Sequence, residues 1–227
     1  MDQDNAPRDS DDGFDLDPIE ARVLAVLIEK AFVTPDNYPM SINAITTGCN
    51  QLTGRDPVME LTDETVQDAI DSLMGRRLVS RRDSASARVP KYEHLVRLRH
   101  SLPPAEQAVL AVLMLRGPQT VGEIRSRCER MHHFGDVSEV EAVLEHLADK
   151  YPPMACTLPL APGTKEARHM HLMSGDEFAT QAAEGVGGPA SASRGGRVAE
   201  LEEEVRRLRQ QVEWLTSEFE SFRKQFE

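Results

Sequence analysis

A short pattern that begins a helix occurs twice in this chain, at residues 16–27 and 102–113. Both copies carry Leu, Pro, Glu and the run Val-Leu-Ala-Val-Leu at the same relative positions. Pro at the first helical position, followed by Glu near the positive end of the helix dipole, is typical of a helix N-terminus. In the first copy Asp17 and Glu20 also form a capping-box pattern. A chain that repeats such a start favours folds built from two copies of one small module.

The residues that follow each copy are also similar. A second helix fits residues 41–50 in the first copy and 120–131 in the second. A third helix is predicted in each copy from apolar residues at helical spacing, within 66–73 and 140–147. The repeat therefore extends beyond the opening helix.

Each third helix has a polar N-cap candidate, Thr62 in the first copy and Ser138 in the second. Two β-prone pieces separated by a turn follow in each copy, and they end in similar sequences at 91–95 and 168–172. The order helix, helix, helix, strand, turn, strand is that of the winged-helix variant of the helix-turn-helix. We therefore predict a mainly α protein with small β-hairpins (α+β), formed by tandem winged-helix domains plus a C-terminal coiled-coil helix. Two unrelated small α+β modules are the alternative.

The last part of the chain, residues 197–227, has an unbroken heptad pattern. Apolar residues alternate at spacings of three and four, and Val at a with Leu at d favours two parallel strands. The residues predicted to form the dimer seam are Val198, Leu201, Val205, Leu208, Val212, Leu215, Phe219 and Phe222. Interhelical pairs such as Glu204 with Arg209 are complementary in charge. We predict a parallel homodimer; a helix packed on its own globular domain is the alternative.

Composition divides the chain into five parts. An acidic tail, predicted to be disordered, occupies residues 1–15 and contributes much of the formal net charge of -12. Winged-helix domains are expected at 16–100 and 101–173, a flexible Gly/Ala/Ser-rich linker at 174–196, and the coiled coil at 197–227. Because so much negative charge lies in the tail, the net charge of the whole chain is a poor guide to its partners.

Simple properties of the sequence bear on its location. No apolar run approaches the ~20 residues that a membrane-spanning helix needs, so we expect no membrane partner. The acidic, polar N-terminus is unlike a signal or transit peptide. The three cysteines are widely separated, which suits reduced thiols better than a disulfide framework. We therefore expect a cytoplasmic protein.

The first predicted domain has an uneven charge distribution. Residues 56–71 hold six acids and no base, whereas residues 76–99 hold eight bases and two acids. Carboxylates along a recognition helix would be repelled by DNA phosphates, but Arg and Lys on the hairpin, or wing, can bind phosphates or a minor groove. The candidate DNA contacts are Arg76, Arg77, Arg81, Arg82, Arg88 and Lys91. The leading hypothesis is a dimeric regulator that binds double-stranded DNA through this wing with low sequence specificity.

A second interpretation fits the same charges. The hairpin arginines can pair with acids of their own helix or of the partner subunit, in a chain that binds another protein and has no contact with DNA. The second predicted domain is the weaker DNA-binding candidate, because its third helix is acidic and its hairpin holds only Lys165 and Arg168. A protein-interaction scaffold with a winged-helix fold is therefore the alternative.

Motifs for catalysis or cofactor binding do not occur in the sequence: it has no phosphate loop, dinucleotide fingerprint or hydrolase elbow. Cys49 has no base partner that the sequence reveals, so we expect a buried small residue. Cys128, His132 and His133 have ligand-like spacing without a four-ligand zinc set. We expect neither an enzyme nor a metal or cofactor site. The polar segment 34–61 either lines a pocket or satisfies backbone groups of a long ordered loop.

Longer motifs within residues 16–173 are similar to one known family. They are residues 34–51, Arg55-Asp-Pro-Val58, Lys91-Tyr-Glu-His94 and the stretch from Leu115 to His132. These motifs resemble the YceH-like family of uncharacterised bacterial proteins. The resemblance implies a tandem winged-helix fold in the bacterial cytoplasm, and it implies neither an activity nor a set of functional residues.

Overall fold

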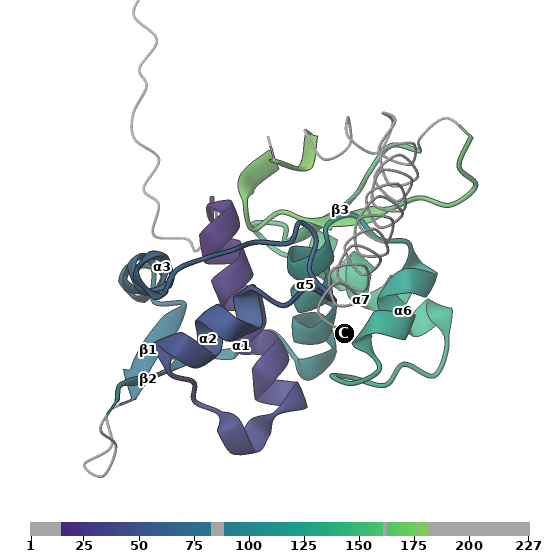
Figure 1. Cartoon of the computed structure of the whole chain (residues 1–227). Helices are drawn as coiled ribbons and strands as arrows, with labels where there is room; N and C mark the ends of the chain where they lie inside the picture. Colours follow the sequence, from purple (N-terminus) through teal and green to yellow (C-terminus); the bar gives the residue numbers. More distant parts are fainter. Residues whose placement is uncertain (1–14, 83–88, 161–162, 177, 181–227) are drawn as a thin grey trace, which may run out of the picture. The chain divides into compact units, whose positions relative to one another are not determined.

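The structure is a computed structural model of the chain, and it describes residues 15–82, 89–160, 163–176 and 178–180 (Figure 1). The predicted coiled coil at 197–227, with all its seam residues, lies outside these ranges. So do Arg88, the predicted tail apart from Asp15, and most of the predicted linker. The described residues contain helices and small antiparallel strand pairs, which confirms the α+β class.

The described elements follow one order twice. The first half, residues 16–100, contains α1 (Pro18–Val33), the 3-10 helix η2 (Pro35–Asn37), α2 (Ile42–Cys49), α3 (Asp63–Gly75), β1 (Val79–Arg82), β2 (Lys91–His94) and α4 (Val96–His100). The second half, residues 101–173, contains α5 (Pro104–Arg116), α6 (Val121–Cys128), α7 (Val137–Ala148), β3 (Ala155–Thr157) and β4 (His169–His171). Apart from η2 and α4, each half thus has three α-helices followed by a two-stranded antiparallel hairpin.

The two halves also match in how the chain enters the second helix. In the first half Met40 forms an isolated antiparallel bridge with Tyr92 of β2, and in the second half Gln119 forms one with His169 of β4. The backbone hydrogen bonds of these bridges are 2.8 to 3.0 Å long. The repeat seen in the sequence is therefore also a repeat of backbone pairing.

Most helices begin where the sequence predicts. The capping box between Asp17 and Glu20 is formed at the start of α1, and Thr62 caps α3. The prediction for Ser138 is wrong, because Asp136 is the N-cap of α7 and its carboxylate accepts the backbone N–H three residues on at 3.1 Å. A carboxylate favours the positive end of the helix dipole, and the Ser138 hydroxyl donates to it at 2.6 Å.

Helices α1 and α5 pack against each other at the centre of the core (Figure 1). All residues of α1 at 21–28 and of α5 at 108–115 are buried. A helix that is apolar on all sides is stable in water only where neighbours cover all its sides. Here α1 also packs on α2 and α3, and α5 also packs on α6 and α7. The repeated Val-Leu-Ala-Val-Leu run therefore forms the core of each half and the contact between them.

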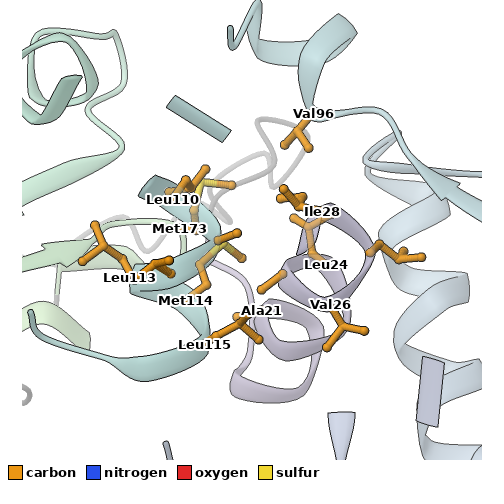
Figure 2. Packing of buried hydrophobic residues seen from close by; sticks show 14 of the residues in the cluster. Ala21, Leu24, Val26, Ile28, Val96, Leu110, Leu113, Met114, Leu115 and Met173 are labelled. Atoms are coloured by element: carbon orange, nitrogen blue, oxygen red, sulfur yellow. The ribbon is translucent and has the colours of Figure 1, made fainter. Parts of the chain in front are cut away.

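One buried cluster includes side chains from both halves. Figure 2 shows Leu24 and Ile28 of α1 in this cluster with Leu110 and Met114 of α5 and with Met173. The backbone N–H of Leu16 donates to the carbonyl of Met173 at 2.8 Å, which joins the beginning of the first half to the end of the second. The division at residues 100 and 101 stays a prediction, and the two halves share one core.

The packed part of the chain extends beyond residue 173. Residues 175–176 and 178–180 are helical, Ala179 is buried, and the ring of Phe178 lies 5.6 Å from the ring of His171. The first residues of the predicted linker at 174–196 therefore pack on the second half.

Candidate nucleic-acid interface

The β1–β2 hairpin follows α3 and carries three of the predicted contact residues. Val79 and Tyr92 are buried, so one face of the hairpin packs on the core. Arg82 lies opposite Lys91 in the strand register and, because successive side chains alternate, both belong to the opposite face. Arg81, Arg82 and Lys91 are all exposed. The hairpin therefore presents Arg82 and Lys91 on its outer face, whereas Arg81, opposite Tyr92 in the register, is exposed on the other face.

Glu93 is the acid on the same face of the hairpin. Its Oε1 lies 2.7 Å from Nε of Arg82 and accepts the hydroxyl of Ser80 at 3.1 Å. The side chain of Arg82 is still 67% exposed, so water screens this ion pair and its contribution to stability is small. Glu93 therefore does little to hold Arg82 in one position.

The end of α3 gives Arg76 a structural role. Its Nε lies 3.5 Å from Oε1 of Glu20, a carboxylate on α1 that is only 4% exposed. The hydroxyl of Ser72 donates to the same oxygen. Arg76 therefore neutralises a buried acid and ties α3 to α1, and it is a poorer candidate for a DNA contact than the sequence predicts.

The second half contains an equivalent ion pair between a buried glutamate and a basic residue after the third helix. Glu106 stands at the position equivalent to Glu20, is 5% exposed, and has Oε2 3.0 Å from Nζ of Lys150, just after α7. In the sequence alone the helix dipole accounts for the repeated glutamate, so its link to the third helix is not visible there. A basic residue just after the third helix in both copies, Arg76 and Lys150, is the signal that could have revealed it.

Arg77 differs from Arg76 in exposure and in backbone conformation. It is exposed and has a φ of 58°, in the left-handed region that favours glycine. The following N–H, of Leu78, donates to the carbonyl of Leu73 at 2.9 Å, which closes the helix in a Schellman motif. The chain therefore places an arginine where the backbone favours glycine, at the base of the basic hairpin.

The solvent face of α3 is acidic. All its carboxylates are exposed: Asp63, Glu64, Asp68 and Asp71. The amide of Gln67, a residue type that can read base edges, donates to Asp71 at 2.9 Å. This face would repel the phosphates of a duplex, so α3 is a poor candidate for entry into a major groove.

The second half presents little positive charge in the equivalent region. The exposed face of α7 carries Glu139, Glu141 and Glu145. Arg125 on α6 is used inside the half, because its Nε and Nη2 donate to the carbonyls of Phe134 and Gly135 at 3.2 and 2.7 Å. The first half is therefore the better nucleic-acid candidate, in agreement with the charge pattern.

The polar segment 34–61 contains a buried arginine network. Arg55 donates to both oxygens of Glu29 at 3.1 and 2.7 Å, to Gln51 at 2.7 Å, and to the carbonyls of Gly48 and Gly54 at 3.0 Å each. All its N–H groups are thus used. Burial opposes the charge of Glu29, but Arg55 overcomes this and holds the pKa of Glu29 below its usual value.

An asparagine orders the other end of this segment. The side chain of Asn50 accepts the N–H of Leu61 and donates to its carbonyl, both at 2.8 Å. This confirms for Asn50 the expectation that amides here satisfy backbone groups. Arg55 and Asn50 thus hold the long connection between α2 and α3 in place.

Two of the described cysteines are buried, and His132 and His133 each have a neighbour within the fold. Cys49 and Cys128 are the last residues of α2 and α6, and burial raises the pKa of both thiols to about 12. Nδ1 of His133 lies 2.8 Å from Glu129, and the ring of His132 packs on Phe134. Within the described ranges, no three potential ligands are grouped to hold a metal ion, and no helix is long and apolar enough to cross a membrane.

Comparison with known proteins assigns the family. The profile of a family described as "Protein of unknown function, DUF480" matches residues 16–164. A UPF0502 protein of Azoarcus sp. (strain BH72) is 65% identical over 225 residues, covering 99% of this chain and 100% of the relative. A UPF0502 protein of Geobacter sulfurreducens is 45% identical over 217 residues, covering 93% and 98%. The chain belongs to this bacterial family, as the sequence motifs indicate.

Proposed function

We propose that the chain is a DNA-binding protein that holds double-stranded DNA through the β1–β2 hairpin, mainly by contacts with phosphates and with low sequence specificity. In this proposal each half is a winged-helix module, and β1–β2 is the wing of the first. The observation that carries the proposal is the group of exposed cations Arg77, Arg81, Arg82 and Lys91.

The charge of the neighbouring helix supports contact through the hairpin rather than through α3. A recognition helix enters the major groove between two rows of phosphates, where the exposed carboxylates of α3 would be repelled. A hairpin can lie along one row of phosphates while α3 stays outside the groove. Contacts of this kind carry no direct information about sequence, so we expect similar affinity for unrelated duplexes.

Arg77 supports the same surface. A left-handed conformation costs a residue with a side chain about 1 kcal/mol relative to glycine. Strained backbone positions are retained where the side chain has a use that stability alone does not explain. Its side chain is exposed beside the hairpin, so we assign it to the phosphate-binding group.

The proposal includes a parallel homodimer formed by the heptads at 197–227. Low-specificity phosphate contacts are weak individually, and two linked hairpins raise the effective concentration of the second contact once the first has formed. The proposed protein acts in the cytoplasm, where bacterial DNA lies, and performs no catalysis.

The test compares the duplex affinities of two double variants. Fluorescence anisotropy measures each affinity across a salt series. Arg81→Ala with Arg82→Ala removes two hairpin cations, and Arg130→Ala with Lys165→Ala removes two exposed cations of the second half. The hairpin variant should bind more weakly and lose about 2 from the slope of log affinity against log salt for each hairpin engaged. The control variant should behave like the wild type. Equal behaviour of the two variants would reject the hairpin as the contact.

A second candidate function is a scaffold that binds another protein. The exposed carboxylates of α3 and α7 favour it, because they place acidic faces on the third helix of each half. Such faces suit a basic partner surface. In the duplex experiment this candidate predicts no binding by the wild type even at low salt.

A further inference from the structure

Arg116, the last residue of α5, has an unusual environment. Its side chain is half-buried, yet the guanidinium has no hydrogen bond or ion pair with any residue in the part of the chain that the structure describes. Burial lowers the pKa of Arg116 and the charges of Arg127 and Arg55 lower it further, whereas the charge of Glu29 opposes this. Its nitrogens still reach solvent, so water or a bound anion can supply the acceptors that the protein does not.

Two carboxylates near Arg116, those of Glu29 and Glu123, already pair with other arginines. Glu29 accepts Arg55 on both oxygens, at 3.1 and 2.7 Å. Glu123 has Nη1 of Arg168 at 2.8 Å. Each acid is thus paired with another cation, and Glu29 compensates the positive charge of Arg116 only in part.

The main chain beside the Arg116 guanidinium is that of Gly54, which has no side chain to push the guanidinium away. Gly54 has a φ of 77°, and a Cβ at this position would lie only 3.0 Å from Nη2 of Arg116. The guanidinium therefore lies directly against the main chain. The N–H of Asp56, two residues on, donates to the carbonyl of Leu115 at 2.8 Å, which fixes this loop to the end of α5.

Arg127 is a second arginine near Arg116. Arg127 on α6 is close enough to be the charge with the largest effect on Arg116, and its own partner, Glu123, is 3.7 Å away. A distance of 3.7 Å leaves the Arg127 fork largely free to take another acceptor. Arg116 ends α5 and Arg127 lies on α6, which packs on α5, while Gly54 belongs to a loop of the first half that lies against Arg116.

We propose that Arg116 and Arg127, beside Gly54, bind an oxyanion of the phosphate type. Arginine forks match the oxygens of phosphate in a bidentate geometry, and the glycine allows the anion and the guanidinium to approach the backbone. The phosphate belongs either to a small anionic ligand or to the DNA backbone. This inference concerns a different surface from the hairpin and stands independently of the proposed function.

The test uses inorganic phosphate as the probe and thermal unfolding of the full chain as the readout, with chloride adjusted to constant ionic strength. The midpoint of the wild type should rise with phosphate concentration. Arg116→Ala should weaken phosphate binding at least about tenfold, because hydrogen bonds between charged groups are lost. Arg130→Ala removes an exposed arginine of the same half and should respond like the wild type.

Arg116→Lys separates binding from folding. Lysine keeps the charge and the aliphatic stem but not the planar fork, so this variant should fold like the wild type and bind phosphate with intermediate affinity. An identical phosphate response of the wild type and Arg116→Ala overturns the proposal.

Duplex binding by Arg116→Ala then identifies the source of the phosphate. If the site holds DNA, duplex affinity falls and the salt slope decreases by about 1. If the site holds a small anion, duplex binding is unchanged while the response to free phosphate is lost. Since the phosphate measurement contains no DNA, failure of this site and failure of the hairpin proposal are separately visible.

Discussion

Arg77 combines a left-handed backbone with an exposed positive charge, and two substitutions separate these properties. Arg77→Gly removes both the charge and the strain, whereas Arg77→Ala removes the charge and keeps the strain. Glycine populates the φ of 58° at no steric cost, while a residue with a Cβ pays about 1 kcal/mol. The Schellman hydrogen bond from Leu78 to Leu73 fixes this conformation, so the cost cannot be relieved by a local shift. The glycine variant should therefore be more stable than the alanine variant by about 1 kcal/mol.

Urea unfolding followed by far-UV circular dichroism measures this difference. Arg82→Gly is the matched control. Replacing arginine by glycine inside a β-strand should lower the stability, by about 0.5–1 kcal/mol. In duplex binding Arg77→Gly and Arg77→Ala should lose the same affinity, since both variants lack the charge. Equal stability of the two variants, or a less stable glycine variant, would refute the assignment of strain to Arg77.

Three further predictions concern the core, the buried ion pair and assembly. Burial lowers the pKa of His171 to about 4, so the unfolded chain binds the proton more readily and stability should fall as pH drops from about 6.5 toward 4. Urea unfolding should show about 2 kcal/mol less loss of stability between pH 8 and pH 5 in His171→Leu than in the wild type. Glu29→Gln leaves Arg55 buried without its counter-charge and should cost about 3 kcal/mol by the same assay, whereas Glu139→Gln should cost little. Light scattering should find the full chain dimeric and a chain ending at Thr180 monomeric; a monomeric full chain would contradict the coiled coil.

The parts of the fold that depend on local sequence were predictable. Helix starts at Pro18 and Pro104 follow from proline and glutamate at fixed positions, and the α+β class follows from their repetition with a hairpin after each third helix. Asp136 was missed as a cap because two acceptors lie two residues apart, and either is compatible with the apolar spacing.

Contacts between distant residues were not predictable. An apolar helix signals complete burial but not its neighbours, so the packing of α1 on α5 had to come from the structure. The same holds for Arg76, whose charge is visible in the sequence while its buried partner Glu20 is far away along the chain. The meeting of Gly54 and Arg116 depends on the path of a long loop, which no periodicity encodes.

Duplex binding by the wild-type full chain across a salt series tests the central proposal most directly. Fluorescence anisotropy with two unrelated duplexes should give similar affinities at about 50 mM salt. Four hairpin cations in contact with phosphates predict a slope of log affinity against log salt of about −3 to −4 for each hairpin engaged. Absence of binding at this salt concentration, or binding that does not weaken as salt rises, would contradict a phosphate-binding hairpin.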